Sequence, residues 1–116
     1  LGQDDYDEFG AMYAKKRQIF MDGLDSMGLK HTVPQGSYFI LVDISDFLAK
    51  PKFQGWTDLQ FCEWMIEEVG VAAVPGSSFF REPINHLIRL HFARSEDSLR
   101  EAIERLGKLS AYLQMD

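Results

Sequence analysis

Residues 87–92 read Leu-Ile-Arg-Leu-His-Phe, an apolar run with an arginine in its interior, and they follow residues 71–80 (VAAVPGSSFF) after a short loop. A run of large apolar residues bounded by loops favours a buried strand. Because side chains alternate across a sheet, one set of residues should face the core: Ile88, Leu90 and Phe92. The other set should share the opposite face: Leu87, Arg89 and His91.

A fixed positive charge inside an apolar strand needs a reason. The guanidinium group of Arg89 stays charged, and its planar fork matches a carboxylate through two parallel hydrogen bonds. On a rigid strand this group would be a pre-positioned binding site for a carboxylate. The alternative is an arginine that faces solvent on a half-exposed strand, and the strand taken alone favours this alternative.

The first half of the chain alternates between helical and extended patterns. A helix is predicted from Asp4 or Asp5, either of which can cap it, to a stop at Gly28. Residues 38–42 are continuously apolar and predict a buried strand, and a loop with one helical turn at 46–49 follows. The apolar residues of the predicted helix recur at helical spacing: Tyr6, Phe9, Tyr13, Phe20, Leu24 and Met27.

Two further helices carry N-terminal signals. Thr57 and the glutamine three residues later have the spacing of a capping box, and Gly70 is expected to end their helix. Cys62 lies on the apolar stripe of this helix, which is more typical of a small core residue than of a nucleophile. Residues 71–74 predict a short strand. Ser95 is expected to cap the last helix, whose inward-facing residues are Leu99, Ala102, Ile103, Leu106 and Leu113.

The predicted order is helix, strand, helix, strand, strand, helix. This order indicates an α+β sandwich in which a small mixed sheet of about three strands is covered by helices mainly on one face. We expect the chain of 116 residues to form a single domain, residues 1–116. Its hydrophobic content of 46% indicates a packed core and not a disordered chain.

Charge and composition exclude several classes of partner. The net charge of −6 disfavours nucleic acid, because phosphate binding needs a basic face. The single cysteine cannot form an internal disulfide, and no apolar run approaches the ~18 residues of a membrane span. We therefore expect a cytoplasmic location and no membrane partner. The three histidines are isolated in the sequence, so no metal site is predicted. Ser77 and Ser78 could donate hydrogen bonds to a ligand, but serines after Pro-Gly are usually turn formers.

Four blocks of the sequence carry a resemblance to a known family. They are residues 34–39 (PQGSYF), 61–65 (FCEWM), 70–80 (GVAAVPGSSFF) and 88–93 (IRLHFA). In this order they resemble the C-terminal small domain of class I and II aminotransferases, which are pyridoxal-phosphate (PLP) enzymes of fold type I. The resemblance extends from about residue 6 to residue 113, and FCEWM before Gly-Val is similar to the kynurenine and methionine aminotransferase branch.

The resemblance implies a specific function. In this family an amino group moves between an amino acid and a 2-oxo acid, with PLP as the electron sink. Arg89 matches the arginine that holds the α-carboxylate of the substrate, so Arg89 is the predicted substrate-binding residue. Residues 71–80 would form part of a wall that closes over the site. The resemblance also implies a homodimer in the full-length enzyme, and PLP bound by a separate large domain.

The chain departs from the family pattern in one respect. None of its lysines lies in a Ser-x-x-Lys stretch of the kind to which the cofactor is attached, so we predict no catalytic and no cofactor-binding residue here. We expect the small domain of a longer aminotransferase, inactive as an isolated fragment, and the start at Leu1 is compatible with an excised piece. Alternatives are the small domain of a PLP-dependent carbon–sulfur β-lyase, or a freestanding carboxylate-binding or structural α+β module. The substrate is not named by the sequence, although the branch favours a large neutral or aromatic side chain.

Overall fold

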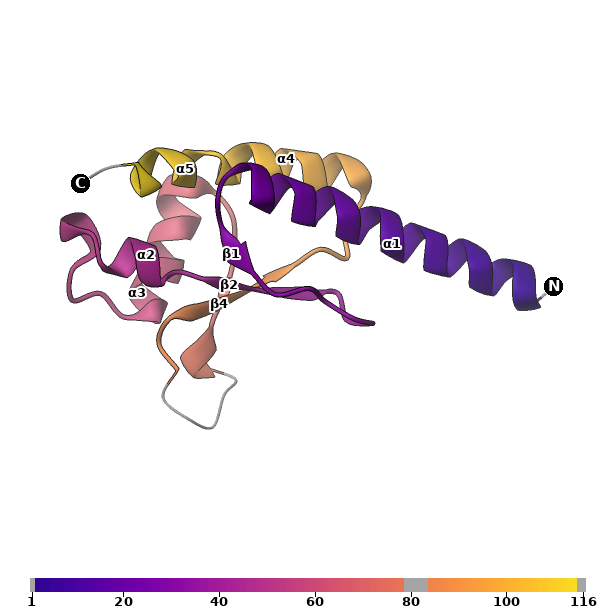
Figure 1. The fold of residues 1–116 in the computed structure, drawn as a ribbon, viewed down its shortest axis with the longest axis horizontal. Helices are drawn as coiled ribbons and strands as arrows, with labels where there is room; N and C mark the ends of the chain where they lie inside the picture. The colour runs from indigo at the N-terminus through magenta and orange to yellow at the C-terminus, as the bar shows by residue number, and fades with distance from the viewer. Residues whose placement is uncertain (1, 79–83, 115–116) are drawn as a thin grey trace.

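The structure, a computed structural model, describes residues 2–78 and 84–114, with side chains from residue 10 onward (Figure 1). The end of the predicted wall segment and the side chains of Tyr6 and Phe9 lie outside the described residues. Short turns of 3-10 or π helix lie at Pro51–Phe53, Met65–Val69 and Gly76–Ser78. In chain order the helices and strands are α1 (Gly2–Ser26), β1 (Lys30–His31), β2 (Phe39–Asp43), α2 (Ser45–Leu48), α3 (Asp58–Trp64), β3 (Val74–Pro75), β4 (Leu87–His91), α4 (Glu96–Leu106) and α5 (Lys108–Leu113).

The described strands form one antiparallel sheet in the order β1-β2-β4-β3. The predicted α+β class is confirmed, but the sheet has four antiparallel strands where a mixed sheet of about three was expected. The unexpected strand, β1, has two residues and pairs with β2, and so short a segment leaves no periodic pattern. Residues 71–73, predicted as strand, lie outside β3. The N–H of Val71 instead donates to the carbonyl of Met65 in the preceding helical turn (3.5 Å).

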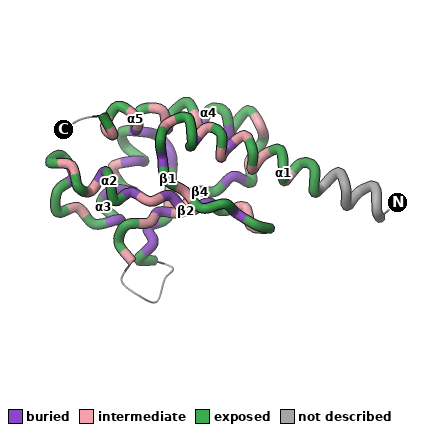
Figure 2. Tube along the Cα trace, viewed as in Figure 1, coloured by how far each residue is buried: buried purple, intermediate pink, exposed green. Residues whose placement is uncertain are grey.

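The core lies between the sheet and the helices that cover one of its faces. The alternation expected for β4 is confirmed, because Ile88 and Leu90 are buried while Arg89 is only half-buried. Phe92, just beyond the strand, is also fully buried. In Figure 2 the buried segments gather where the strands meet the helices, and α1 and α4 lie side by side over them. On the opposite face of the sheet, the described side chains of β2 and β4 are exposed or half-buried.

Local signals set most of the helix ends. The capping box at Thr57 is present, with its hydroxyl accepting from the N–H of Gln60 (3.2 Å). Gly70 ends that helix with a φ of 82°, a left-handed conformation that favours glycine. Ser95 caps α4 by accepting from the N–H of Ser98 (3.2 Å). At the start of the chain α1 already runs from Gly2, so Asp4 and Asp5 lie within it and do not cap it.

Candidate functional site

Arg89 lies in the middle of β4, on the open face of the sheet. Its register partners are Leu41 on β2 and Val74 on β3, so strands on both sides hold its backbone. Because the residues before and after it are buried in the core, β4 cannot rotate without exposing them. The position of its backbone, and the face of the sheet from which its side chain projects, are therefore determined by the rigid part of the fold.

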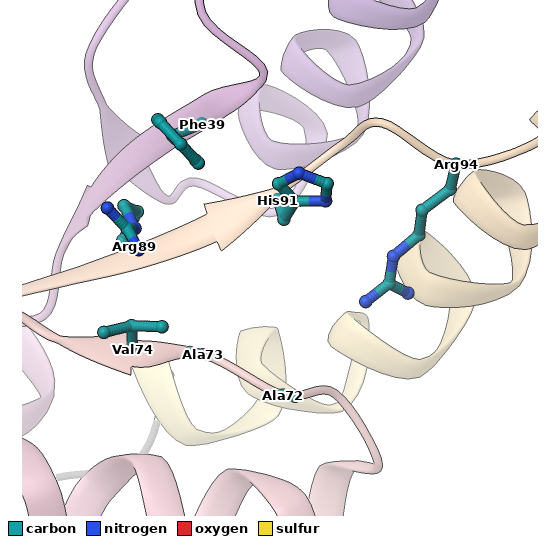
Figure 3. A pocket seen from close by; sticks show the side chains of 7 residues that line it. All are labelled: Phe39, Ala72, Ala73, Val74, Arg89, His91 and Arg94. Atoms are coloured by element: carbon teal, nitrogen blue, oxygen red, sulfur yellow. The ribbon is translucent and has the colours of Figure 1, made fainter.

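A groove of about 270 Å³ opens beside Arg89. It is bounded by β2, by the segment that leads into β3, by β4 and by the loop before α4 (Figure 3). Four of the seven described lining residues are apolar and the other three are two arginines and a histidine, so no carboxylate is among them. The lining residues are Phe39, Ala72, Ala73, Val74, Arg89, His91 and Arg94.

The ring of Phe39 lies close to two of the polar groups. The guanidinium carbon of Arg89 is 4.3 Å from the centroid of this ring, which is a cation–π distance. The ring of His91 is 5.8 Å from the same ring, centroid to centroid. Phe39 itself is 41% exposed, so this aromatic surface faces the groove and not the core. The prediction that Arg89 and His91 share one face is confirmed, and His91 is exposed there.

Sequence reasoning missed Arg94. It lies after β4, in the loop just before α4, where the alternation of a strand no longer tells which way a side chain points. Figure 3 shows its guanidinium group directed into the groove, between His91 and Ala72. The groove thus brings together two arginines, and only one of them was singled out by the strand pattern.

The loop after β3 is held by a buried carboxylate. Asp58, at the start of α3, is only 2% exposed. It accepts hydrogen bonds from the N–H of Ser77 (2.8 Å) and from the hydroxyl of Ser77 (3.0 Å). The Ser77 hydroxyl therefore has a structural partner, which favours the turn-forming role over donation to a ligand. Ser78 is exposed and does not line the groove. Neither serine is among the described residues that line the groove.

Cys62 is confirmed as a core residue. It is 2% exposed within the apolar cluster under the sheet. Burial, with smaller contributions from the charges of Asp58 and Glu63, raises the pKa of its thiol to about 12. A thiol that stays protonated is a poor nucleophile and a poor metal ligand.

In the described part of the chain, no group of three or more histidine, cysteine, aspartate or glutamate side chains lies close enough together to hold a metal ion. Among the helices of that same part, none combines the length and the apolar character required to cross a membrane.

Comparison with known proteins gives consistent matches. Residues 2–106 match the family of aminotransferases of class I and II. The chain is 41% identical to the methionine aminotransferase of Escherichia coli over 98 residues, and 37% identical to human kynurenine–oxoglutarate transaminase 1 over 110 residues. These alignments cover 84% and 87% of this chain but 24% and 26% of the relatives. The chain therefore spans about a quarter of their length.

Solved structures agree with the sequence matches. A crystal structure from Escherichia coli that identified a methionine aminotransferase function superposes with a TM-score of 0.78 at 36% identity, covering 93% of this chain and 27% of that one. The aromatic aminotransferase of Pyrococcus horikoshii superposes with a TM-score of 0.76 at 30% identity, covering 92% of this chain and 26% of that one.

Proposed function

This chain belongs to the class I and II aminotransferases, and we propose that it is the C-terminal small domain of such an enzyme. In this proposal Arg89 binds the α-carboxylate of an amino acid or a 2-oxo acid. The full-length enzyme transfers an amino group between these two substrates. The isolated chain, residues 1–116, is inactive by itself and acts when joined to a large domain in a cytoplasmic homodimer.

The observation that carries the proposal is the guanidinium group of Arg89 beside an open groove. It projects from a strand that is hydrogen-bonded on both sides, and the ring of Phe39 lies against it. A carboxylate entering the groove would meet a fork that needs little reordering, so less entropy is lost on binding. Fixing the α-carboxylate also fixes the direction of the bonds at the substrate Cα, which is the reacting carbon in transamination.

PLP supplies the electron sink for this family's chemistry. The groove does not fit the cofactor, because its described lining contains neither a lysine, to which PLP would be attached, nor a carboxylate for its pyridinium nitrogen. We therefore assign the cofactor to the large domain. The contribution of this chain is to bind and orient the substrate.

The segment before Ser77 is proposed as the closing wall of the site. Ala72, Ala73 and Val74 line the groove opposite Phe39, and the bonds between Ser77 and Asp58 hold the end of this segment against α3. When the domain moves as a unit, these small apolar side chains would approach the substrate and exclude water from it.

The test uses the full-length enzyme that carries this chain, with Arg89→Lys and Arg89→Ala. We compare kcat/KM for an amino acid with kcat/KM for the amine formed by its decarboxylation. A charge-assisted contact in a closed site contributes about 2–5 kcal/mol, so Arg89→Ala should lower the amino-acid value by roughly 30- to several-thousand-fold. Arg89→Lys, which keeps the charge but loses the fork, should fall in between.

The amine has no carboxylate for Arg89 to bind, so kcat/KM for the amine should change little in either variant. Arg100→Ala is the matched control, because Arg100 is an exposed arginine of α4 outside the groove. Equal losses for the amino acid and the amine would mean that Arg89 is structural, and the proposed function would have to be abandoned.

A further inference from the structure

Tyr13 joins the middle of α1 to the loop that leads into β2. This loop, residues 32–38, lies between β1 and β2 and contains no helix or strand. The hydroxyl of Tyr13 donates to the carbonyl of Ser37 (2.8 Å) and accepts from the N–H of Gly36 (2.9 Å). One side chain of α1 therefore satisfies two backbone groups that lie 24 and 23 positions further along the chain.

A second side chain of α1 supports the same loop. Arg17, one helical turn after Tyr13, donates from Nη1 to the carbonyl of Pro34 (3.0 Å). The described backbone of residues 33–37 makes its hydrogen bonds to these two side chains and to no other group in the described part of the chain. Backbone groups without a strand partner depend on such side-chain contacts for a defined position. The path of the loop is therefore set largely by α1.

The loop ends where the groove begins. Tyr38 packs on the core side, with its ring edge-on to that of Tyr13 at 5.0 Å between centroids. The carbonyl of Tyr38 accepts from the N–H of Phe92 (2.9 Å). The next residue, Phe39, points to the opposite face and lines the groove. Because Ser37 is held only two residues earlier, a shift of the loop would be passed directly to the ring of Phe39.

The ring of Phe39 is one of the contacts that orient the guanidinium group of Arg89. Its centroid lies 4.3 Å from the guanidinium carbon (Figure 3), which is within the range of a cation–π interaction. Phe39 is also the first residue of β2, and the ends of a strand open more readily than its centre. The position of this ring therefore depends on the loop that precedes it.

We propose that Tyr13 is a positioning residue for the carboxylate site. By holding the loop before β2, its hydroxyl keeps the ring of Phe39 against Arg89, so that the guanidinium fork is oriented before a carboxylate arrives. This inference rests on the proposed function and deepens it, because it adds a residue outside the groove that controls how well the site binds. Tyr13 is not among the described residues that line the groove, so it acts through Phe39 and not by touching the substrate there.

A purely stabilising role for Tyr13 makes a different prediction. Its ring also contacts that of Phe92, at 5.9 Å between centroids, so removing the whole side chain would disturb the core. Tyr13→Phe avoids this problem, because it keeps the ring and removes both hydrogen bonds of the hydroxyl. If the hydroxyl served stability alone, Tyr13→Phe would reduce the amount of folded enzyme and lower the activity toward every substrate by the same factor.

The experiment uses the full-length holoenzyme with Tyr13→Phe. Tyr112→Phe is the matched control, because the ring of Tyr112 lies on α5, where it packs against Phe53 and Trp64. We measure kcat and KM for phenylalanine and for 2-phenylethylamine, which lacks the carboxylate. Tyr13→Phe should lower kcat/KM for phenylalanine by about 3- to 10-fold, mainly through KM. The value for 2-phenylethylamine, and both values in the control, should stay within about twofold.

A second variant tests the route through Phe39. Phe39→Leu keeps an apolar residue at the start of β2 but removes the aromatic ring from the guanidinium group of Arg89. It should itself lower kcat/KM for phenylalanine, again mainly through KM. If Tyr13 acts through this ring, adding Tyr13→Phe to Phe39→Leu should lower the value by less than about twofold more. An undiminished loss from Tyr13→Phe in the double variant would overturn the inference.

Two other results would also overturn it. Equal losses for phenylalanine and 2-phenylethylamine would mean that Tyr13 serves stability alone, and no loss for phenylalanine would mean that the hydroxyl does not affect the site. The two proposals fail in different ways. If Arg89→Ala separates an amino acid from its amine but Tyr13→Phe does not, only the role of Tyr13 is wrong. If Arg89→Ala does not separate them, the proposed function fails first.

Discussion

Removing the carboxylate of Asp58 should loosen the segment that lines the groove. This carboxylate accepts from the N–H of Leu59 (2.9 Å) and from the N–H and hydroxyl of Ser77. The bond to Leu59 lies at the start of α3, where water can replace it. In Asp58→Ala the two groups of Ser77 lose their acceptor, and they come from a residue 19 positions away in the sequence.

The expected magnitude follows from these contacts. Hydrogen bonds to a charged group contribute about 1.5–3 kcal/mol each, and the cost of burying the carboxylate offsets part of that gain. We expect Asp58→Ala to lower the free energy of unfolding by about 2–4 kcal/mol and Ser77→Ala by about 1 kcal/mol. With a urea m-value of about 2 kcal/mol/M, the midpoint for Asp58→Ala should fall by about 1–2 M.

The assay is urea unfolding of the 116-residue chain, followed by circular dichroism. Asp97→Ala is the matched control, because Asp97 is also in the first turn of a helix but is exposed. Asp97→Ala should lower the free energy of unfolding by only about 0.3–1 kcal/mol, because it removes a single charge at a helix N-terminus. In the double variant of Asp58 and Ser77 the two losses should be coupled by at least ~0.5 kcal/mol. A loss at Asp58 no larger than at Asp97, or strictly additive losses, would refute the reasoning.

Three further outcomes are expected. Because burial raises the pKa of Cys62 to about 12, its thiol should resist a thiol reagent at pH 8 in the native chain and react after unfolding in urea, as an absorbance assay would show. Burial raises the pKa of Asp43, but the hydrogen bonds from the hydroxyl and N–H of Ser45 (2.6 and 2.9 Å), together with the charges of His86 and Lys30, bring this pKa below its ordinary value. The stability that Asp43 contributes is therefore present above about pH 4 and lost below it, so Asp43→Asn should show a smaller loss of stability between about pH 5 and pH 2.5 than the unmodified chain. At Gly76 a Cβ would lie 2.7 Å from the carbonyl oxygen of Leu87, so Gly76→Ala should lower the free energy of unfolding by about 1–3 kcal/mol in the same urea assay.

The sequence by itself determined the features that depend on neighbouring residues. Alternation along residues 87–92 was enough to place Arg89 and His91 on the face away from the core, because the two faces of a strand differ by one position. The capping signal at Thr57 and the stop at Gly70 were likewise predictable, since a helix end is satisfied by groups within one turn of it. The α+β class followed from the order of these elements.

Only the tertiary structure decided which distant segments meet. β1 exists because the chain returns beside β2, and residues 71–73 stay outside β3, where Val71 donates back to the preceding helical turn. These outcomes depend on pairing partners that no local pattern encodes, because a ladder hydrogen bond is indifferent to the identity of the side chain.

The groove shows most clearly how the tertiary structure brings distant segments together. Its lining comes from β2, the segment before β3, β4 and the loop before α4, and residues 22 positions apart, Ala72 and Arg94, come together there. Arg94 follows the strand, so no periodicity indicates its direction, and its place at the groove is set by how the loop before α4 packs over the sheet. The sequence could identify the arginine on the strand, but the second guanidinium group became visible only when the chain folded around a common cavity.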